Sequence, residues 1–309
     1  MIAPDLRRAF LDYELKRAPS YAIDTLGTDA VLENLSRKLD RATIAQMEDY
    51  AAVQKYAELC PVAGADPVDY FNKIIELDGD RAICLVPSFE NLDVERPFVL
   101  VNFSTFDVVD RLEEIWERAA FEYRTFRPVR LSFNGPPGLP DFDADIHTYA
   151  STFGELRARP YPSGYDRIAL GAETNLDFYD RYAELYLRLK EKSPGHPSFQ
   201  ESRESLTRVM NDQGLFSIFV DGNWAGIFGA RNEYERYLHG FCVIEEILAE
   251  EYRGQHLGAA LQRRAIEAIP ADDRTVLFGT IDGKNIASQR TAERVGRRPI
   301  YTAYWYPRV

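Results

Sequence analysis

Residues 252–261 have the composition and the position of an anion-binding turn. They read Tyr-Arg-Gly-Gln-His-Leu-Gly-Ala-Ala-Leu and follow an apolar, strand-like run that ends near Leu248. From Leu257 to Ala268, apolar residues recur at helical spacing. The first turn of a helix has unpaired N–H groups and the positive end of the helix dipole, and small residues let a phosphate approach them. The sequence therefore predicts a phosphate-binding helix start here.

Two adjacent carboxylates, Glu245 and Glu246, lie in the apolar run before this turn. Neighbouring strand residues face opposite sides of a sheet, so at most one of the two can face a substrate cleft. A carboxylate in an apolar strand is a candidate general base, because burial shifts its pKa. The alternatives are that both side chains are exposed, or that Glu246 pairs with an arginine.

The turn resembles the acyl-CoA-binding motif of the GNAT superfamily of N-acyltransferases. That motif has Arg or Gln, two variable residues, Gly, one variable residue, and then Gly or Ala. Arg253, Gly258 and Ala259 fit it, and Gly254 fits its common Arg-Gly opening. His256 stands where the family usually has glycine. Its side chain must point away from the phosphates, whereas the backbone N–H donors remain.

Residues 285–296 also resemble the last helix of the family, with Arg297 at the position of a usual phenylalanine. The resemblance implies acetyl-CoA, or another acyl-CoA, as cosubstrate. The residues implied in binding it are Ile247, Leu248, Ala249, Arg253, Gly254, Gln255, His256, Leu257, Gly258, Ala259, Asn285 and Ser288.

The resemblance also assigns catalytic roles. Many relatives place a general base eight residues before the motif arginine, which corresponds to Glu245, with Glu246 in reserve. A tyrosine acid is common where this chain has Ala292. Either Tyr301 or Tyr304 on the final strand replaces it, or no acid is needed, because a thiolate is a tolerable leaving group.

The order of elements supports this resemblance. From residue 167 to residue 306, the pattern predicts strand, two helices, three strands, helix, strand, helix and strand, as in a GNAT domain. We expect an α/β (α+β) fold of two domains, with a mixed central sheet flanked by helices.

The expected domains are residues 1–147 and 165–309, joined by a linker at 148–164. In the first, helices are expected at 6–15, 29–39, 44–59, 68–77 and 108–123, with strands at 82–86, 98–103 and 129–133. Strand, strand, helix, strand repeats the central order of the second domain. The first domain is therefore either a degenerate GNAT-like copy without CoA binding or an unrelated α/β domain.

Composition narrows the function. A net charge of −12 over 309 residues argues against nucleic acid as a partner. No apolar run is long enough to cross a membrane, and no signal peptide is recognisable. The histidines and cysteines lack ligand spacing, so no metal is expected. Three widely spaced cysteines indicate a cytoplasmic protein.

These observations predict transfer of an acetyl group from acetyl-CoA to an amine of a small molecule or peptide, directly within a ternary complex. One alternative is a catalytically lapsed CoA-binding or regulatory protein that retains the fold. Another is transfer of an aminoacyl or longer acyl chain. The acceptor and the oligomeric state stay open.

Overall fold

The computed structural model describes residues 2–192 and 200–307, which form two compact units. Unit 1 contains Met1–His147, Tyr234–Leu238 and Ile300–Val309, and unit 2 contains Thr148–Glu233 and His239–Pro299. The division at residue 147 falls within a strand, and the range expected as a linker, 148–164, holds the end of that strand and a short helix.

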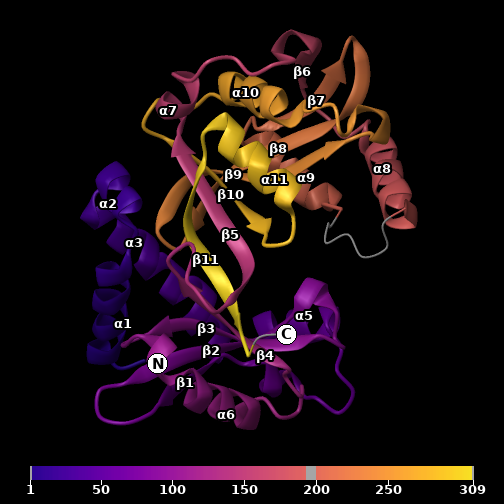
Figure 1. Cartoon of the computed structure of the whole chain (residues 1–309). Coiled ribbons are helices and arrows are strands. Elements are labelled where there is room, and N and C mark those ends of the chain that lie inside the picture. The colour runs from indigo at the N-terminus through magenta and orange to yellow at the C-terminus, as the bar shows by residue number, and fades with distance from the viewer. Residues whose placement is uncertain (1, 193–199, 308–309) are drawn as a thin grey trace. The chain divides into compact units, whose positions relative to one another are not determined.

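Unit 1 has helices on a mixed sheet (Figure 1). The strands have the order β1-β2-β3-β4-β11. β3 and β4 pair directly and in parallel, and helix α6 connects them in the chain. The other pairs are antiparallel. The elements are α1 (Pro4–Arg17), α2 (Ser20–Leu26), α3 (Thr28–Leu39), α4 (Ala45–Glu48), α5 (Tyr50–Leu59), β1 (Lys73–Glu76), β2 (Ala82–Phe89), β3 (Pro97–Ser104), α6 (Leu112–Glu122), β4 (Arg130–Gly135) and β11 (Arg298–Tyr306).

Several segments of unit 1 differ from the expectations. The helix expected at 44–59 is divided at Asp49, whose backbone is extended and whose side chain caps α5. The helix expected at 68–77 is wrong, because Lys73–Glu76 forms β1 and pairs with β2. Two β-branched residues, Ile74 and Ile75, favour the strand. The final strand β11 pairs antiparallel with β4, and Tyr304 packs in the core of unit 1 rather than in the domain 165–309.

Unit 2 has the strand order β5-β10-β9-β8-β7-β6 (Figure 1). Its elements are β5 (Asp143–Thr152), α7 (Phe153–Arg157), β6 (Ile168–Ala172), α8 (Tyr179–Lys192), α9 (Arg203–Asn211), β7 (Leu215–Val220), β8 (Asn223–Glu235), β9 (Leu238–Leu248), α10 (Gly258–Ala268), β10 (Val276–Asp282) and α11 (Ile286–Val295). β7, α10 and α11 agree to within one residue with the ranges that the sequence predicts for them, 215–220, 257–269 and 285–295.

Helices cover both faces of the unit 2 sheet. One apolar cluster joins the strands to α10 and to Val295 of α11, and a second joins them to α8 and α9. Adjacent strand residues divide between the clusters, with Ile227 in the second and Phe228 in the first. Because neighbours in a strand face opposite sides, the clusters lie on opposite faces. α8 and α10 thus approach the middle of the sheet from different sides.

Candidate active site

A pocket of about 760 Å³ lies in unit 2 where β9 and β10 separate. The parallel ladder joins Val276–Phe278 to Gly240–Cys242. The residues that follow in each strand, 243–248 and 279–282, line the pocket instead. Its volume is typical of a site for a small ligand. Backbone groups of both strands therefore face a space that an extended ligand could enter.

The N-terminus of α10 forms one wall of this pocket. Leu257 precedes the helix, is 2% exposed, and anchors the turn in the apolar core. No side chain caps the helix, so the N–H groups of its first turn are left for a ligand or water. A Cβ on Gly258 would lie 2.9 Å from Thr291 Cγ2. This glycine therefore allows α10 and α11 to approach closely at the pocket wall.

His256 keeps a glycine-like backbone. Its φ is 60°, in the left-handed region that glycine adopts freely. Histidine is among the few other residues found there with some frequency. Its side chain is exposed, and Arg294 Nη1 lies 3.4 Å from its Nδ1. The turn thus follows a left-handed path although histidine replaces the glycine of the motif.

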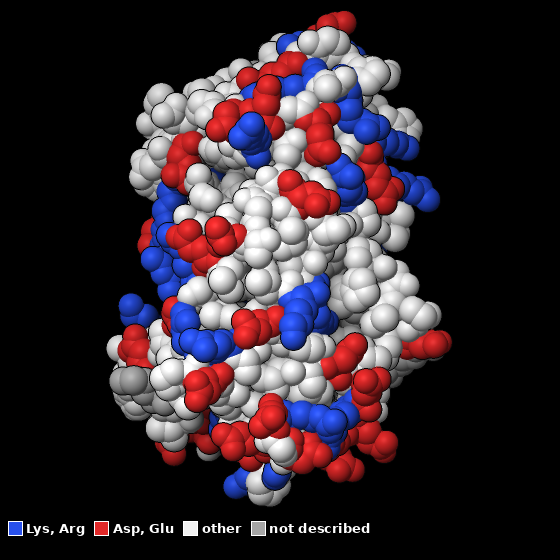
Figure 2. Space-filling view, turned by 90° about the vertical axis from the view of Figure 1, so that its left-hand side faces the viewer, with Lys and Arg blue, Asp and Glu red and all other residues white. Residues whose placement is uncertain are grey.

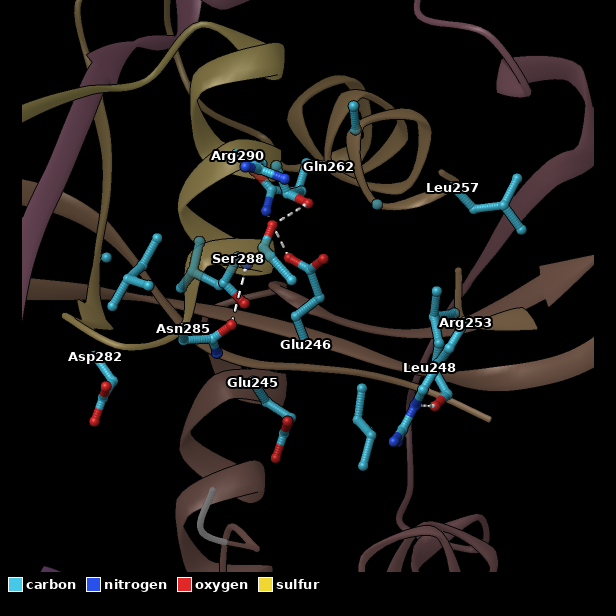
Figure 3. Close-up of a pocket in the computed structure, with 18 of the residues that line it drawn as sticks. Glu245, Glu246, Leu248, Arg253, Leu257, Gln262, Asp282, Asn285, Ser288 and Arg290 are labelled. Carbon is cyan, nitrogen blue, oxygen red and sulfur yellow. Dashed lines mark hydrogen bonds between the residues drawn. The ribbon is translucent and has the colours of Figure 1, made fainter. Parts of the chain in front are cut away.

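Exposed cations surround the helix start. Arg253, Arg290 and Arg294 all line the pocket and are exposed. Arg253 Nε donates to the carbonyl of Leu248 at 2.7 Å, which ties the turn to the end of β9 (Figure 3). A positive helix terminus with three guanidinium groups nearby suits a ligand with several phosphates.

Glu245 is buried beneath two tyrosines. It is 4% exposed, and its carboxylate accepts hydrogen bonds from the Tyr182 hydroxyl and from the Tyr186 hydroxyl at 2.9 Å. Burial raises the pKa of Glu245 to about 7, although the two hydrogen bonds oppose this shift. A carboxylate with this pKa is suited to accept a proton near neutral pH.

Glu246 points to the other face of β9. Figure 3 shows the two glutamates directed to opposite sides of the strand. Gln262 Nε2 of α10 donates to Glu246 Oε2 at 2.7 Å. Burial also raises the pKa of Glu246, against the effects of Gln262 and Arg297.

The α11 side of the pocket begins at Asn285. Its Oδ1 accepts from the N–H of Ser288 at 3.1 Å and starts the helix. The helix ends at Gly296, whose φ of 112° is left-handed. This backbone conformation favours glycine, because side chains with a Cβ rarely adopt it.

The structure brings most of the predicted site residues together. Those that line the pocket are Glu245, Glu246, Ile247, Leu248, Arg253, Gly254, His256, Leu257, Gly258, Ala259, Asn285 and Ser288. Ala249 and Gln255 do not line it, because the Ala249 N–H donates to Ala225 and the Gln255 side chain bonds Glu251 and Arg167.

Tyr301 and Tyr304 are also absent from the pocket lining. Both belong to unit 1, where the Tyr304 hydroxyl donates to the Pro136 carbonyl at 2.6 Å and accepts from the Leu139 N–H. The Tyr301 hydroxyl lies 3.3 Å from Glu235 Oε1. The aromatic side chains of β11 pack in the core of unit 1.

The partners of the two glutamates were missed from the sequence. Tyr182 and Tyr186 recur at helical spacing among apolar residues, so they resemble ordinary core residues. Gln262 lies on the helix that follows the anion-binding turn. A signal was present: two tyrosines four residues apart share a helix face, and buried hydroxyl groups need hydrogen-bond partners.

Charge is mixed on the face of the molecule that Figure 2 shows, where acidic and basic side chains are interspersed. Within residues 2–192 and 200–307, no helix has the length and apolarity to cross a membrane. In the same part of the chain, no group of three or more His, Cys, Asp or Glu side chains is arranged to hold a metal ion.

The sequence model of the acetyltransferase (GNAT) family matches residues 177–296. This segment, which contains the pocket lining except for Arg297, is therefore a GNAT acetyltransferase domain. A search of the curated proteins found no match.

Solved structures share the fold. A GCN5-related N-acetyltransferase from Sphaerobacter thermophilus is similar over 99% of this chain and 96% of its own, with a TM-score of 0.53 and 13% identity. A tandem GNAT protein from the clavulanic acid biosynthesis pathway is similar over 84% of this chain and 95% of its own, with a TM-score of 0.45 and 15% identity. At such identities, the first of these likenesses establishes a GNAT fold and nothing finer.

Proposed function

We propose that this protein is an N-acetyltransferase that moves an acetyl group from acetyl-CoA to an amine of a small molecule or peptide. Transfer is direct, within a ternary complex. Unit 2 holds the reaction, and residues 1–147 belong to a separate unit that shapes acceptor use. The observation that carries the proposal is the buried Glu245, with a pKa of about 7, in the pocket where β9 and β10 separate.

The pocket residues fit an acyl-CoA. The uncapped start of α10 and the exposed Arg253, Arg290 and Arg294 suit its phosphates. The facing backbones of Ile247 and Leu248 suit an extended chain with amide groups. Asn285 and Ser288 lie on the α11 wall. When bound, acyl-CoA supplies an activated acyl group as a thioester.

Glu245 accepts the proton of the acceptor amine through a water molecule. An amine with a pKa near ~10 is protonated in neutral solution, so it must lose a proton before it can attack. The carboxylates of Glu201 and Glu245 both line the pocket and attract a cationic acceptor. Tyr182 and Tyr186 hold the Glu245 carboxylate in place.

The test is acetyl transfer to a panel of amines, measured by release of free CoA thiol. Glu245→Gln should lower kcat by roughly 10²- to 10⁴-fold, the usual contribution of a general base, with acetyl-CoA affinity close to that of the wild type. Glu184→Gln is the matched control and should behave as wild type, because Glu184 is exposed on α8 and pairs with Arg188. Equal rates for wild type and Glu245→Gln would exclude Glu245 as the base.

A second candidate is a CoA-binding regulatory protein without turnover. It is favoured by Ala292, which is fully buried where many relatives have a tyrosine acid. This candidate predicts acetyl-CoA binding by the wild type and no transfer to any amine, and Glu245→Gln would then change nothing.

A further inference from the structure

Arg297 is a buried cation on the wall of the active-site pocket. It follows Gly296, the residue that ends α11, and its N–H donates to the Ala292 carbonyl at 2.9 Å. Its side chain is 4% exposed, and Nη2 donates to Gln262 Oε1 at 3.0 Å. Among the residues that the structure describes, neither Nε nor Nη1 has a hydrogen-bond partner.

The guanidinium stands where the two strands separate. A Cβ on Gly279 would lie 3.1 Å from Arg297 Nη1 and 3.3 Å from Val243 Cβ. Gly279 and Val243 are the first residues of β10 and β9 beyond the paired segments, and both line the pocket. Nη1, one of the two unpartnered donors, therefore lies at the closed end of the space between the strands.

Charged neighbours do not account for these donors. Glu246 faces Arg297 from β9, but Gln262 stands between them, donating to the carboxylate and accepting from the guanidinium. Tyr149 of β5 and Cys242 of β9 are the other titratable groups nearby. A buried cation with two free donors is costly unless an anion satisfies it.

We infer that Arg297 stabilises the thiolate that leaves when the acyl group is transferred. This inference rests on the proposed function. The C–N bond forms as the C–S bond breaks, the amine proton passes to Glu245, and the C–S electron pair leaves on sulfur. An arginine keeps its proton, so Arg297 holds the negative charge by hydrogen bonding and does not act as an acid.

A tyrosine near the sulfur would have another role than Arg297, because it can donate a proton. Tyr252 also lines the pocket and could deliver a proton to sulfur. A hydrogen bond from a tyrosine and a fixed cation both favour the thiolate, but only the effect of the cation is lost when Arg297 is replaced by an uncharged residue. Titration of the thiol of bound CoA in wild type and in Arg297→Met therefore separates the two roles without any turnover.

The experiment first measures CoA binding by calorimetry, and then titrates the thiol of bound CoA by its thiolate ultraviolet absorbance. Wild type should lower the thiol pKa by about one to three units relative to free CoA. Arg297→Met should abolish the shift, and Arg297→Lys, which keeps a charge, should restore part of it. Arg298→Met is the control, since Arg298 is exposed and pairs with Glu155, and it should leave the shift unchanged.

The outcomes are distinct. Wild type that binds CoA without lowering its thiol pKa overturns the inference and leaves the proposed function intact. An equal shift in wild type and Arg297→Met does the same. Absence of CoA binding in wild type overturns the proposed function, and the inference with it. If Arg297→Met does not fold, Arg297→Lys decides the matter: its shift should be smaller than that of wild type, and an equal shift overturns the inference.

Discussion

Two opposing effects set the ionisation of Glu245. Burial in the apolar face of β9 disfavours the carboxylate, whereas the Tyr182 and Tyr186 hydroxyl groups stabilise it, and burial is the larger effect. Glu201 raises the pKa further through its negative charge. The resulting pKa of about 7 keeps the carboxyl protonated in mild acid and ionised above neutrality.

The rate of transfer should therefore rise with pH. A base must be ionised to accept a proton, so kcat/KM should increase as the pH passes about 7. Tyr186→Phe removes one donor to the carboxylate, which raises the pKa of Glu245 and should move this rise to higher pH. Tyr179→Phe, which removes a hydroxyl on the same helix that bonds Glu201 and Gln200, should not move it. A rise at the same pH in all three proteins would contradict the role of the tyrosines.

His256 provides a test of backbone strain. His256 has a left-handed backbone conformation, so His256→Gly should raise the free energy of unfolding. The gain should be about 1 kcal/mol or less, because glycine also has more freedom in the unfolded chain. His256→Ala keeps the strain and removes the imidazole, so it should not stabilise. Denaturant unfolding compares the three proteins. Stabilisation by alanine equal to that by glycine would mean that the imidazole, not the backbone, carries the cost.

At the scale of elements, the close approach of α10 and α11 shapes the wall of the pocket. Gly258 faces Thr291, and an added methyl group would lie 2.9 Å from Thr291 Cγ2. The motif glycine therefore has a packing role beside any role in phosphate binding. A substitution at Gly258 changes both, so a variant that restores the packing is needed to separate them.

Gly258→Ala should lower the free energy of unfolding by about 1 to 3 kcal/mol, the usual cost of overpacking. Thr291→Ala should recover most of this loss in the double variant, because it removes the colliding atoms. Urea unfolding of the four proteins completes the cycle. Additive effects of the two substitutions would show that Gly258 and Thr291 do not collide.

Phosphate binding can then be tested in the background that restores packing. Gly258→Glu with Thr291→Ala places a negative charge at the start of α10, where it should repel phosphates and abolish CoA binding. Gly258→Ala with Thr291→Ala should still bind CoA. Calorimetry compares the two, and equal affinities would contradict phosphate binding at this helix.

The elements that could be predicted were those with a clear period or a clear end. Two apolar runs, 215–220 and 224–230, on either side of Asp221-Gly222-Asn223 predict the hairpin of β7 and β8, and Gly296 predicts the end of α11. β5 was not predicted, because its sequence, Asp-Ala-Asp-Ile-His-Thr-Tyr-Ala-Ser-Thr, has little apolar alternation. Both faces of its second half are buried, including Thr148 and Ser151. Tertiary packing, which a short window of sequence does not show, determines such a strand.

The residues of the candidate site also divide into those that the sequence could predict and those that it could not. The small residues and Arg253 follow one another in the sequence, so their proximity in the structure could be predicted. The tyrosines around Glu245 are about sixty residues away in the chain, as the separations of 63 and 59 residues show. Their meeting depends on α8 lying across β9, which residue types alone do not indicate.

For the whole molecule, the division into units predicts the outcome of a truncation. Unit 1 includes the C-terminal segment Ile300–Val309, where β11 pairs with β4. Residues 148–309 without the first 147 would expose the paired edge of β11 and the buried ring of Tyr304. An exposed apolar edge strand promotes association. The fragment should therefore aggregate or self-associate in size-exclusion chromatography, and a monomeric, fully folded fragment would contradict this division.

The most direct test of the account is calorimetric titration of the purified protein with acetyl-CoA, with free CoA and ATP as comparison ligands. The account predicts micromolar binding of both CoA species and no binding of ATP, because the pocket joins the start of α10 to the space between β9 and β10, which the pantetheine arm of CoA would fill and which ATP has no arm to fill. Such binding would justify the search for the acceptor amine. Absence of binding by either CoA species would contradict the assignment of this pocket to acyl-CoA.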